Sequence, residues 1–486
     1  WIMRNETAAA LTLTQGSGAN VVIAAGQTKI VATDGAGSGA IVYEMDDLEL
    51  AGNLTVTGVL DVDGTANLDV IDVDGAANFA ADVTFADGAD IITASAGTSN
   101  VRIGVNAGNS IASGGNFNTV VGDEAGTAIT TGDLMTAVGY KALFTEDTGE
   151  RSTAVGAFAL TAQNAAVENY NTAIGYAAGT GITTGFENTL IGGLAGDALT
   201  DSDRNTAVGF ASLSSNTLGQ YNTAIGYAAL LAANHTTATD AYNTAVGYAA
   251  GAAVTTATIN TLIGALAGDA LTSGNSNVAV GFTALSADTQ GDRNVAIGNN
   301  ALAQQNFTTS TDSYNVAIGY VAGGSVTTGV QNTIIGGLAG DAITDADANV
   351  ALGYLALSSN TVGSNSVAVG SAALQTQNPA TAADMYNVAV GHQAGKAVTT
   401  GVRNTFTGGL AGDALTDADD NVALGYLALS ADTLGSNTTA VGKAALHAQN
   451  FTTATDSYNT AVGFHAGLSV TTGVNNTLIG GLAGDA

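Results

Sequence analysis

A five-residue phrase that ends in glycine recurs 22 times between residues 100 and 486, and this repetition constrains the fold more than any other feature. Asn171-Thr-Ala-Ile-Gly175 is a typical copy. Successive copies open at positions 171, 188, 205 and 222, in steps of 17, and a longer step of 21 leads to position 243, where the four-step cycle starts again. Later cycles open at positions 315, 387 and 459, so the period is constant at 72. A period this short is typical of a solenoid, in which each unit buries its apolar side only against its neighbours.

Each phrase consists of Asn, then Thr or Val, then usually Ala or Leu, then Val, Ile or Leu, and finally Gly. This alternation over β-branched residues predicts a short strand. Glycine at the fifth place of every copy indicates a bend with positive φ, or another backbone in close approach. These structural glycines include Gly175, Gly192, Gly209, Gly226, Gly247 and Gly264.

Asparagine opens 18 of the 22 copies, and Met135, Ser152, Ser366 and Thr438 open the others. Because other residue types replace it, we expect this side chain to cap a turn or to stack in a ladder rather than to perform chemistry. The structural asparagines include Asn171, Asn188, Asn205 and Asn222.

Between two phrases, each rung passes through a small apolar corner such as Tyr176-Ala-Ala-Gly179 and then through a segment rich in Thr, Gly and Asn. Two strands and two turns fit into the shorter rung, so we predict an all-β fold, a parallel β-solenoid (β-roll) of about 22 rungs. At ~4.8 Å per rung, the rod would be on the order of 100 Å long. Aromatic residues make up only 6% of the chain, so each rung contains few large side chains that it can bury. We therefore expect several rolls to associate along their length.

The phrases Asn171-Thr-Ala-Ile-Gly175, Asn277-Val-Ala-Val-Gly281 and Ser366-Val-Ala-Val-Gly370 resemble the repeated motif in the head domains of trimeric autotransporter adhesins. The resemblance covers about four fifths of the chain and implies a left-handed parallel β-roll that exists as a homotrimer. The rungs of this chain, of 17 and 21 residues, are longer than the repeat typical of those heads, so we expect the solenoid to have a larger cross-section here. The same phrase also occurs in bacteriophage tail fibres, where the longer rung is familiar.

Two regions precede the repeat array of residues 100–486. Residues 1–47 alternate like a small antiparallel β-module with Gly-rich turns, and they resemble modules found along phage tail fibres. In residues 48–99, Asp61-Val-Asp-Gly64 recurs as Asp72-Val-Asp-Gly75, which indicates short strands broken by turns. Strands this short have no partner within one chain, so we predict an intertwined triple-stranded stalk and a linker.

Composition excludes several classes of function. The chain has no cysteine, so neither disulfides nor thiolate metal sites are expected, and its single proline, Pro379, leaves the ladders intact. We find no apolar stretch long enough to span a membrane and no signal peptide at the start. A formal net charge of −31 repels nucleic acid and anionic membrane, so neither is an expected partner, and it favours solubility of a long β-rod.

Acidic residues recur in the second rung of several cycles at a spacing that could gather oxygen ligands for calcium. The equivalent rung at Asp269 lacks two of the three acids, so solvated turns are the favoured interpretation, and we expect no metal and no cofactor. The acids in question are Asp197, Asp201, Asp203, Asp341, Asp345, Asp347, Asp413, Asp417 and Asp419.

Aromatic residues follow the register: ten come directly after the phrase glycine, and five tyrosines, Tyr170, Tyr242, Tyr314, Tyr386 and Tyr458, directly precede the phrase that opens a cycle. At a corner such rings plug the roll or seal contacts between chains, and a platform for stacking sugars is the alternative. The four histidines, at 235, 392, 447 and 465, occupy unmatched places in the cycle. The sequence of one chain shows no Ser/His/Asp or paired-acid arrangement, so we expect that the protein is not an enzyme. A pair of acids formed across two chains, of the kind that hydrolyses polysaccharide, stays open as an alternative.

The four extra residues in every fourth rung are the best candidate for variable function, because loops on a rigid scaffold commonly carry recognition. Plain decoration is the alternative, and we favour it. The candidate recognition residues are Asn234, His235, Asn306, Phe307, Asn378, Pro379, Asn450 and Phe451.

The sequence therefore favours an extracellular virion component, a homotrimeric phage tail fibre that acts as a structural spacer and projects a host-recognition tip absent from this chain. Its expected partners are its own copies, other virion tail proteins at the N-terminal side and, as a candidate, a host cell-surface glycan. One alternative is a bacterial surface adhesin of the trimeric autotransporter class. Another is an ice-binding solenoid, because Thr recurs at the second place of the phrase, although Val replaces it in rungs such as those of Val278 and Val295.

Overall fold

The computed structural model describes residues 1–14, 20–33, 42–44 and 95–485. They belong to two compact units, residues 1–88 and residues 89–486, which we treat separately. The described residues form strands and turns and contain no helix. The predicted stalk and most of the linker after it lie outside the described residues.

The first unit contains short antiparallel strands. β1 (Ile2–Arg4) pairs with β4 (Thr28–Thr33), and β4 pairs with β5 (Val42–Glu44). β2 (Leu11–Leu13) pairs with β3 (Val21–Ile23). A small cluster of buried apolar side chains lies between these pairs, and it consists of Val21, Ile23 and Val31 with Met3 and Leu13 packed against it.

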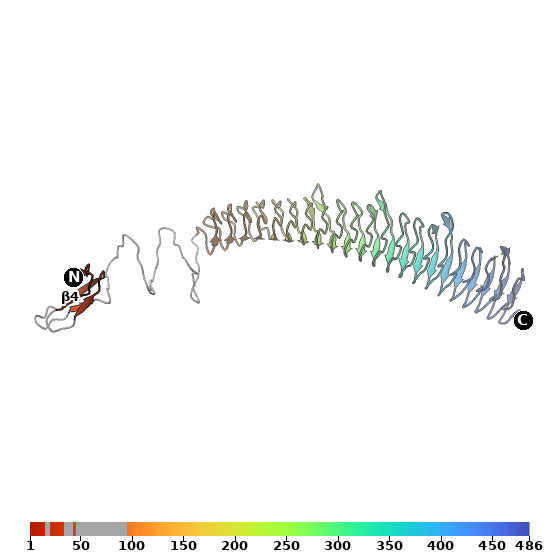
Figure 1. The fold of residues 1–486 in the computed structure, drawn as a ribbon. Helices are drawn as coiled ribbons and strands as arrows, with labels where there is room; N and C mark the ends of the chain where they lie inside the picture. Colours follow the sequence, from red (N-terminus) through yellow and green to blue (C-terminus); the bar gives the residue numbers. More distant parts are fainter. Residues whose placement is uncertain (15–19, 34–41, 45–94, 486) are drawn as a thin grey trace. The chain divides into compact units, whose positions relative to one another are not determined.

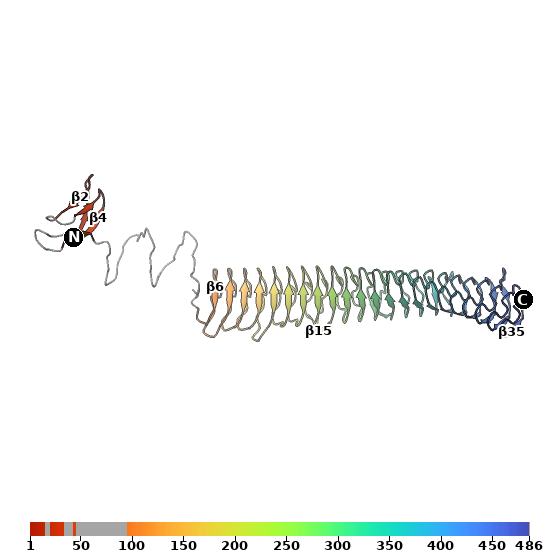
Figure 2. The same cartoon turned by 90° about the horizontal axis from the view of Figure 1, so that it is seen from below.

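The second unit is a solenoid in which one three-residue strand per rung builds a parallel ladder of 22 strands, from β6 (Val101–Ile103) to β35 (Thr477–Ile479). Strands pair in register, so that Thr172 of β10 lies opposite Thr189 of β11. Among the described residues β6 pairs only with β7 and β35 only with β34, so the ladder is open at both ends. Figures 1 and 2 show the resulting rod, with the strands along one side. The predicted all-β parallel solenoid of about 22 rungs is confirmed.

The remaining strands of this ladder are β7 (Thr119–Val121), β8 (Thr136–Val138), β9 (Thr153–Val155), β10 (Thr172–Ile174), β11 (Thr189–Ile191), β12 (Thr206–Val208), β14 (Thr223–Ile225), β16 (Thr244–Val246), β17 (Thr261–Ile263), β18 (Val278–Val280), β20 (Val295–Ile297), β22 (Val316–Ile318), β23 (Thr333–Ile335), β24 (Val350–Leu352), β26 (Val367–Val369), β28 (Val388–Val390), β29 (Thr405–Thr407), β30 (Val422–Leu424), β32 (Thr439–Val441) and β34 (Thr460–Val462).

The prediction of a second strand in every rung is wrong. Two-residue pairs occur only four times beside the main ladder: β13 (Gly219–Gln220) with β15 (Thr239–Asp240), β19 (Gly291–Asp292) with β21 (Thr311–Asp312), β25 (Gly363–Ser364) with β27 (Ala383–Asp384), and β31 (Gly435–Ser436) with β33 (Thr455–Asp456). Elsewhere in the described solenoid, apart from one isolated parallel bridge between Glu150 and Glu168, the chain returns through turns and irregular segments. Residues in the left-handed region, such as Ala177 (φ 54°) and Glu187 (φ 56°), bend the backbone of the rung.

The phrase glycine has both a positive φ and a neighbouring backbone in close approach, the two reasons that its invariance suggested. Gly175 has φ 138°, a conformation that L side chains rarely adopt, and an ideal Cβ there would lie 2.5 Å from the carbonyl oxygen of Gly192 in the next rung. The glycines therefore stack backbone on backbone, and any side chain in this column would push two rungs apart.

The phrase asparagines form a buried hydrogen-bond ladder along the rod. The backbone N–H of Asn188 donates to Oδ1 of Asn171 at 2.9 Å, and Nδ2 of Asn171 donates to the carbonyl of Gly185 at 2.7 Å. Each side chain thus ties the end of its own rung to the start of the next strand. Because both partners are backbone groups of buried chain, they would otherwise lack hydrogen bonds.

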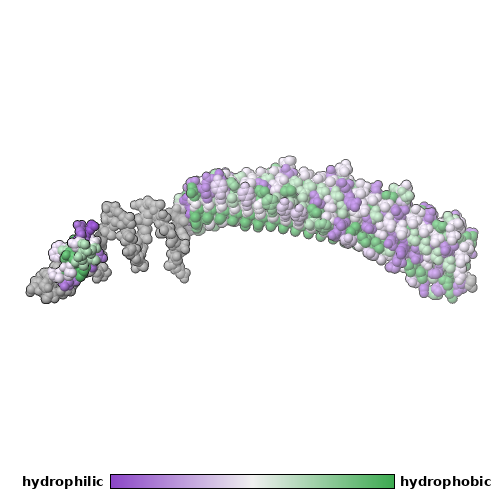
Figure 3. Space-filling view, in the orientation of Figure 1, coloured by the Kyte–Doolittle hydropathy of each residue, from purple (hydrophilic) through white to green (hydrophobic). Residues whose placement is uncertain are grey.

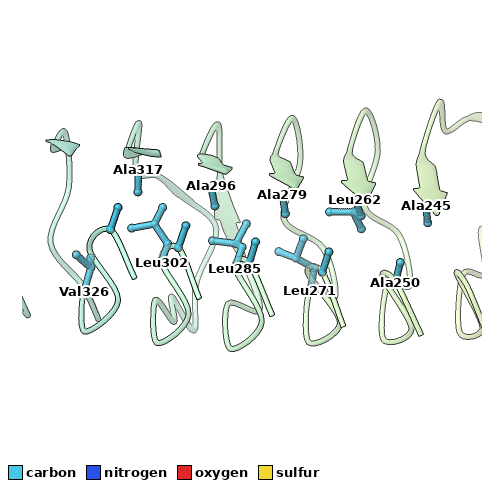
Figure 4. Packing of buried hydrophobic residues seen from close by; sticks show 14 of the residues in the cluster. Ala245, Ala250, Leu262, Leu271, Ala279, Leu285, Ala296, Leu302, Ala317 and Val326 are labelled. Carbon is cyan, nitrogen blue, oxygen red and sulfur yellow. The ribbon is translucent and has the colours of Figure 1, made fainter. Parts of the chain in front are cut away.

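We number the residues of each rung from the residue that opens the phrase, which is position 1. The large side chains that fill the interior come from different positions in different rungs. The second rung of a cycle has a large residue at position 3 and Gly at position 9, as in Leu262 and Gly268. The third and fourth rungs have Ala at position 3 and Leu at position 9, as in Leu285 and Leu302. Figure 4 shows Leu262 entering from its strand and Leu285 and Leu302 entering from the opposite wall. An ideal Cβ on Gly268 would lie 2.8 Å from Cδ2 of Leu262, so the interior volume is conserved.

Candidate functional site

The outer face of the strand ladder is the most extensive surface feature of the solenoid. In 20 of the 22 ladder strands the middle residue is buried, and it is partly buried in the two terminal strands, β6 and β35; the flanking residues, at positions 2 and 4, face outward and are partly or largely exposed. Position 4 carries Val, Ile or Leu on 21 of the 22 strands, and Thr407 is the exception. In Figure 3 this ladder side forms a band of hydrophobic residues. The rod therefore presents a continuous apolar strip, which we call the ladder face.

The insertion loops project from the side opposite the ladder face (Figure 1). Their candidate recognition residues divide into two sets: Asn234, Asn306, Asn378 and Asn450 are exposed, whereas His235, Phe307, Pro379 and Phe451 are buried. The buried residues plug the roll, since an ideal Cβ on Gly435 would lie 2.7 Å from Cδ2 of Phe451. Only the exposed set, together with the exposed threonines that follow, is available to a partner in this single chain.

A buried carboxylate anchors the loop of residues 305–312. Asp288, at position 12 of the third rung, accepts hydrogen bonds from the backbone N–H of Gly291 at 3.0 Å and of Phe307 at 3.1 Å. It also accepts one from Nε2 of Gln305 at 2.7 Å, and Oε1 of Gln305 in turn accepts from Nδ2 of Asn315 at 2.8 Å. Burial raises the pKa of Asp288. Asp432, Gly435, Gln449, Phe451 and Asn459 repeat this arrangement in the next cycle but one.

Sequence reasoning missed this polar network. Position 12 holds Ile, Val or Leu in the first two rungs of a cycle, whereas the third rung holds Glu146, Asn216, Asp288, Asn360 or Asp432. In two of the cycles this residue matches its loop: Phe307 supplies an N–H to Asp288, whereas Pro379 has no N–H and its cycle carries the neutral Asn360. Alignment of the chain with itself, shifted by one full cycle, would have shown this column.

Six of the nine acids considered for calcium brace neighbouring rungs. Oδ1 of Asp201 accepts from the Thr184 hydroxyl at 2.6 Å, and Oδ1 of Asp203 accepts from the backbone N–H of Phe186 at 3.0 Å. Asp345, Asp347 and Asp419 repeat these contacts, and Asp417 pairs with Thr400. Within the described ranges, no three His, Asp or Glu side chains gather in a way that could hold a metal ion.

The remaining three calcium candidates, Asp197, Asp341 and Asp413, lie, with the equivalent Asp269, at position 10 of the second rung. In Asp197, Asp269, Asp341 and Asp413, one carboxylate oxygen is buried without a hydrogen-bond partner among the described residues. Burial is the main cause that raises the pKa of each of these carboxyl groups. They are spaced one cycle apart.

The aromatic residues form two exposed columns on either side of the ladder face. One follows the phrase glycine and includes Tyr176, 60% exposed, and Phe210, 51% exposed. The other precedes the phrase in the fourth rung, where Tyr314 is 49% and Tyr386 is 56% exposed. The hydroxyl of Tyr386 lies 3.3 Å from Oδ2 of Asp384. In the single chain these rings cover corners, and they remain half accessible.

The histidines are scattered, as the sequence indicated. His235 is buried beneath its loop, and burial lowers its pKa, whereas His465 stacks on Phe464 with ring centroids 3.8 Å apart. His392 and His447 occupy other columns of the cycle.

A scan of the chain against protein-family models finds no match, and no curated protein matches the sequence. Across the part of the chain that the structure describes, no helix has the length and apolar character needed to cross a bilayer. The functional argument therefore rests on the ladder face, the loops and the aromatic columns.

Proposed function

We propose that this chain is a structural fibre of a phage tail that assembles as a homotrimer, with the ladder faces packed inward and the insertion loops turned outward. The observation that carries the proposal is the ladder face. Isoleucines at position 4, such as Ile174 and Ile263, are each 39% exposed in the single chain, and equivalent apolar residues continue along the whole ladder. Apolar surface of this extent is typical of an interface.

Copies of the same chain suit this surface because their rungs have the same spacing. Parallel copies keep apolar column against apolar column over the full length of the rod, which no partner with a different repeat achieves. The loops, which project away from the ladder face, then stay accessible on the outside (Figure 1). A rigid rod with outward loops suits a spacer that holds a recognition element at a distance from the particle.

Sedimentation velocity of the full chain tests the assembly. We expect an elongated particle of about three times the chain mass of 47.5 kDa. Charged substitutions at three successive outward positions, Val280→Glu, Ile297→Glu and Ile318→Glu, should convert it to monomers, because three like charges would then meet at every level. The control Thr308→Glu, on an exposed loop, should leave the mass unchanged. A monomeric wild-type particle contradicts the proposal.

The assignment to a virion rests on the resemblance of the repeats and of residues 1–47 to tail fibres. Gold-labelled antibodies against the chain should decorate phage tails, and genes for tail assembly should neighbour its gene. A membrane anchor encoded in the same reading frame would instead support the trimeric adhesin.

A second candidate, an ice-binding solenoid, is favoured by one observation. Position 2 is Thr on nine successive strands, from Thr119 of β7 to Thr261 of β17, and these strands pair in register. Two results together would favour this candidate over the fibre. The wild-type chain would be a monomer that shows thermal hysteresis, and the substitutions Thr206→Lys and Thr223→Lys would abolish that hysteresis.

A further inference from the structure

The insertion loop of residues 233–240 lacks the polar network that anchors the loop of the next cycle. The side chain of Asn216, at position 12 of the third rung, bonds only to its own turn: Nδ2 donates to the carbonyl of Gly219 at 2.7 Å, and Oδ1 accepts from the N–H of Gly219 at 2.9 Å. Ala233 stands where the next cycle has Gln305, so it offers no amide. The position 12 side chain therefore makes no hydrogen bond to this loop.

The ring of His235 fills the space under this loop, and it does so without a hydrogen bond. The residue is 4% exposed, and neither Nδ1 nor Nε2 has a hydrogen-bond partner among the described residues. An ideal Cβ on Gly219 would lie 2.6 Å from Nδ1 and 2.7 Å from Oδ1 of Asn216, so the ring lies against the third-rung turn. A buried imidazole without partners favours its neutral form, because a charge there would have neither water nor a counter-ion.

The segments that are hydrogen-bonded to the loop bring no charge to the ring. Residues 213–220 of the preceding rung and residues 251–258 of the following rung contain no Asp, Glu, Lys, Arg, Tyr or second His. Within the loop the one acid is Asp240, which is exposed. Burial lowers the pKa of His235, and the backbone of Thr256 opposes this shift without making a hydrogen bond to either ring nitrogen.

We propose that the loop of residues 233–240 is released in acid, because protonation of His235 drives its ring out of the interior and into water. The corresponding places in two later cycles hold Phe307 and Phe451, which bind no proton. Asp288, beneath the first of these, keeps acceptor oxygens when it is protonated. Acid should therefore open one loop and leave those two closed. This device belongs to the single chain and goes beyond the proposed fibre.

The direction of the pH response follows from the burial of the ring. The remaining contacts of the loop include a hydrogen bond from the N–H of Asn234 to the carbonyl of Thr255 at 2.9 Å and one from Thr239 to Leu218 at 3.3 Å. The open loop binds the proton of His235 more tightly than the closed loop does. The closed form is therefore fully stable above the ordinary pKa of 6.5 and loses stability as the pH falls from there through the lowered pKa.

Hydrogen exchange of the full chain at about pH 7.5 and about pH 5 tests the inference, with exchange times scaled for the intrinsic effect of pH. The loops of residues 305–312 and 449–456 serve as references within the same molecule. We expect the protection of residues 233–240 to fall roughly tenfold relative to these references at the lower pH. Equal protection of all three loops at the lower pH overturns the proposal.

Two variants identify the group that responds. His235→Phe copies the later cycles and should remove the pH response while the loop stays closed. Asn216→Asp places a carboxylate beside the ring, so it should hold the protonated ring inside and keep the loop closed at about pH 5. A response that persists in both variants overturns the role of His235. Sedimentation velocity at both pH values keeps the test separate, since the particle mass reports on the fibre and not on the loop.

Discussion

The first two rungs of each four-rung cycle and the last two enclose the same volume in different ways. In the second rung, Leu262 and Leu271 fill the interior around Gly268. In the third rung, Leu285 takes over from the opposite wall, and position 12 becomes the buried Asp288. At position 12 the apolar half contributes only packing, whereas the polar half exchanges part of its packing for hydrogen bonds that anchor a loop. A rung can therefore gain a loop without losing its place in the stack.

The largest expected effect tests the apolar half. Leu262→Ala removes a fully buried side chain beside a glycine that cannot fill the space, so we expect a loss of about 2–5 kcal/mol. Because solenoid rungs interact chiefly with their neighbours, the loss should be local. Hydrogen exchange should quicken in β16, β17 and β18 and not in β34. Uniform exchange along the rod would contradict the local character.

The next effect concerns the polar half. Asp288→Ala leaves the Gly291 and Phe307 N–H groups and the Gln305 amide without their acceptor, at a cost of about 1–3 kcal/mol. Limited proteolysis should then cut the loop of residues 305–312 faster. In the matched variant Asn360→Ala, only hydrogen bonds within its own rung, to Gly363, are lost, so the loop of residues 377–384 should change less.

The pH dependence sharpens the same comparison. Burial raises the pKa of Asp288 above its ordinary value of 3.8, so the folded chain binds this proton more tightly than the unfolded chain does. Stability of this segment should therefore fall as the pH rises from about 3.8 through the folded pKa. Asp288→Asn should remove that slope. The measurement is the difference in unfolding free energy between wild type and variant across pH 4 to 8, and a constant difference would contradict the assignment.

The smallest effect lies outside both halves. Arg403 donates to Asp420 through Nε at 2.7 Å and through Nη2 at 2.8 Å, and both side chains are exposed. Exposed pairs of this kind contribute roughly 0.2–1 kcal/mol, so Arg403→Ala should be nearly silent in denaturant titration. A loss as large as that of Leu262→Ala would show that the outer surface contributes to stability as much as the interior.

The sequence was sufficient for the ladder, because strand, bend and asparagine recur in every rung and the rung length leaves little freedom. It was not sufficient for the return path. Leucine at φ 49°, as in Leu230, contradicts the preference of that residue, and only stacking on neighbouring rungs enforces it. Phe307 and Phe451 appeared as loop residues open to a partner, yet they lie inside, because the local pattern does not show which way a loop residue turns.

The agreement between cycles has a genetic consequence. Deletion of residues 243–314 would place Asn315 after Tyr242, where Asn243 stands, and every neighbouring rung would still meet a rung of the kind it expects. Recombination between the repeated stretches of the gene can therefore lengthen or shorten the rod in steps of ~19 Å while the fold is retained. Length becomes a heritable trait that selection can adjust one cycle at a time.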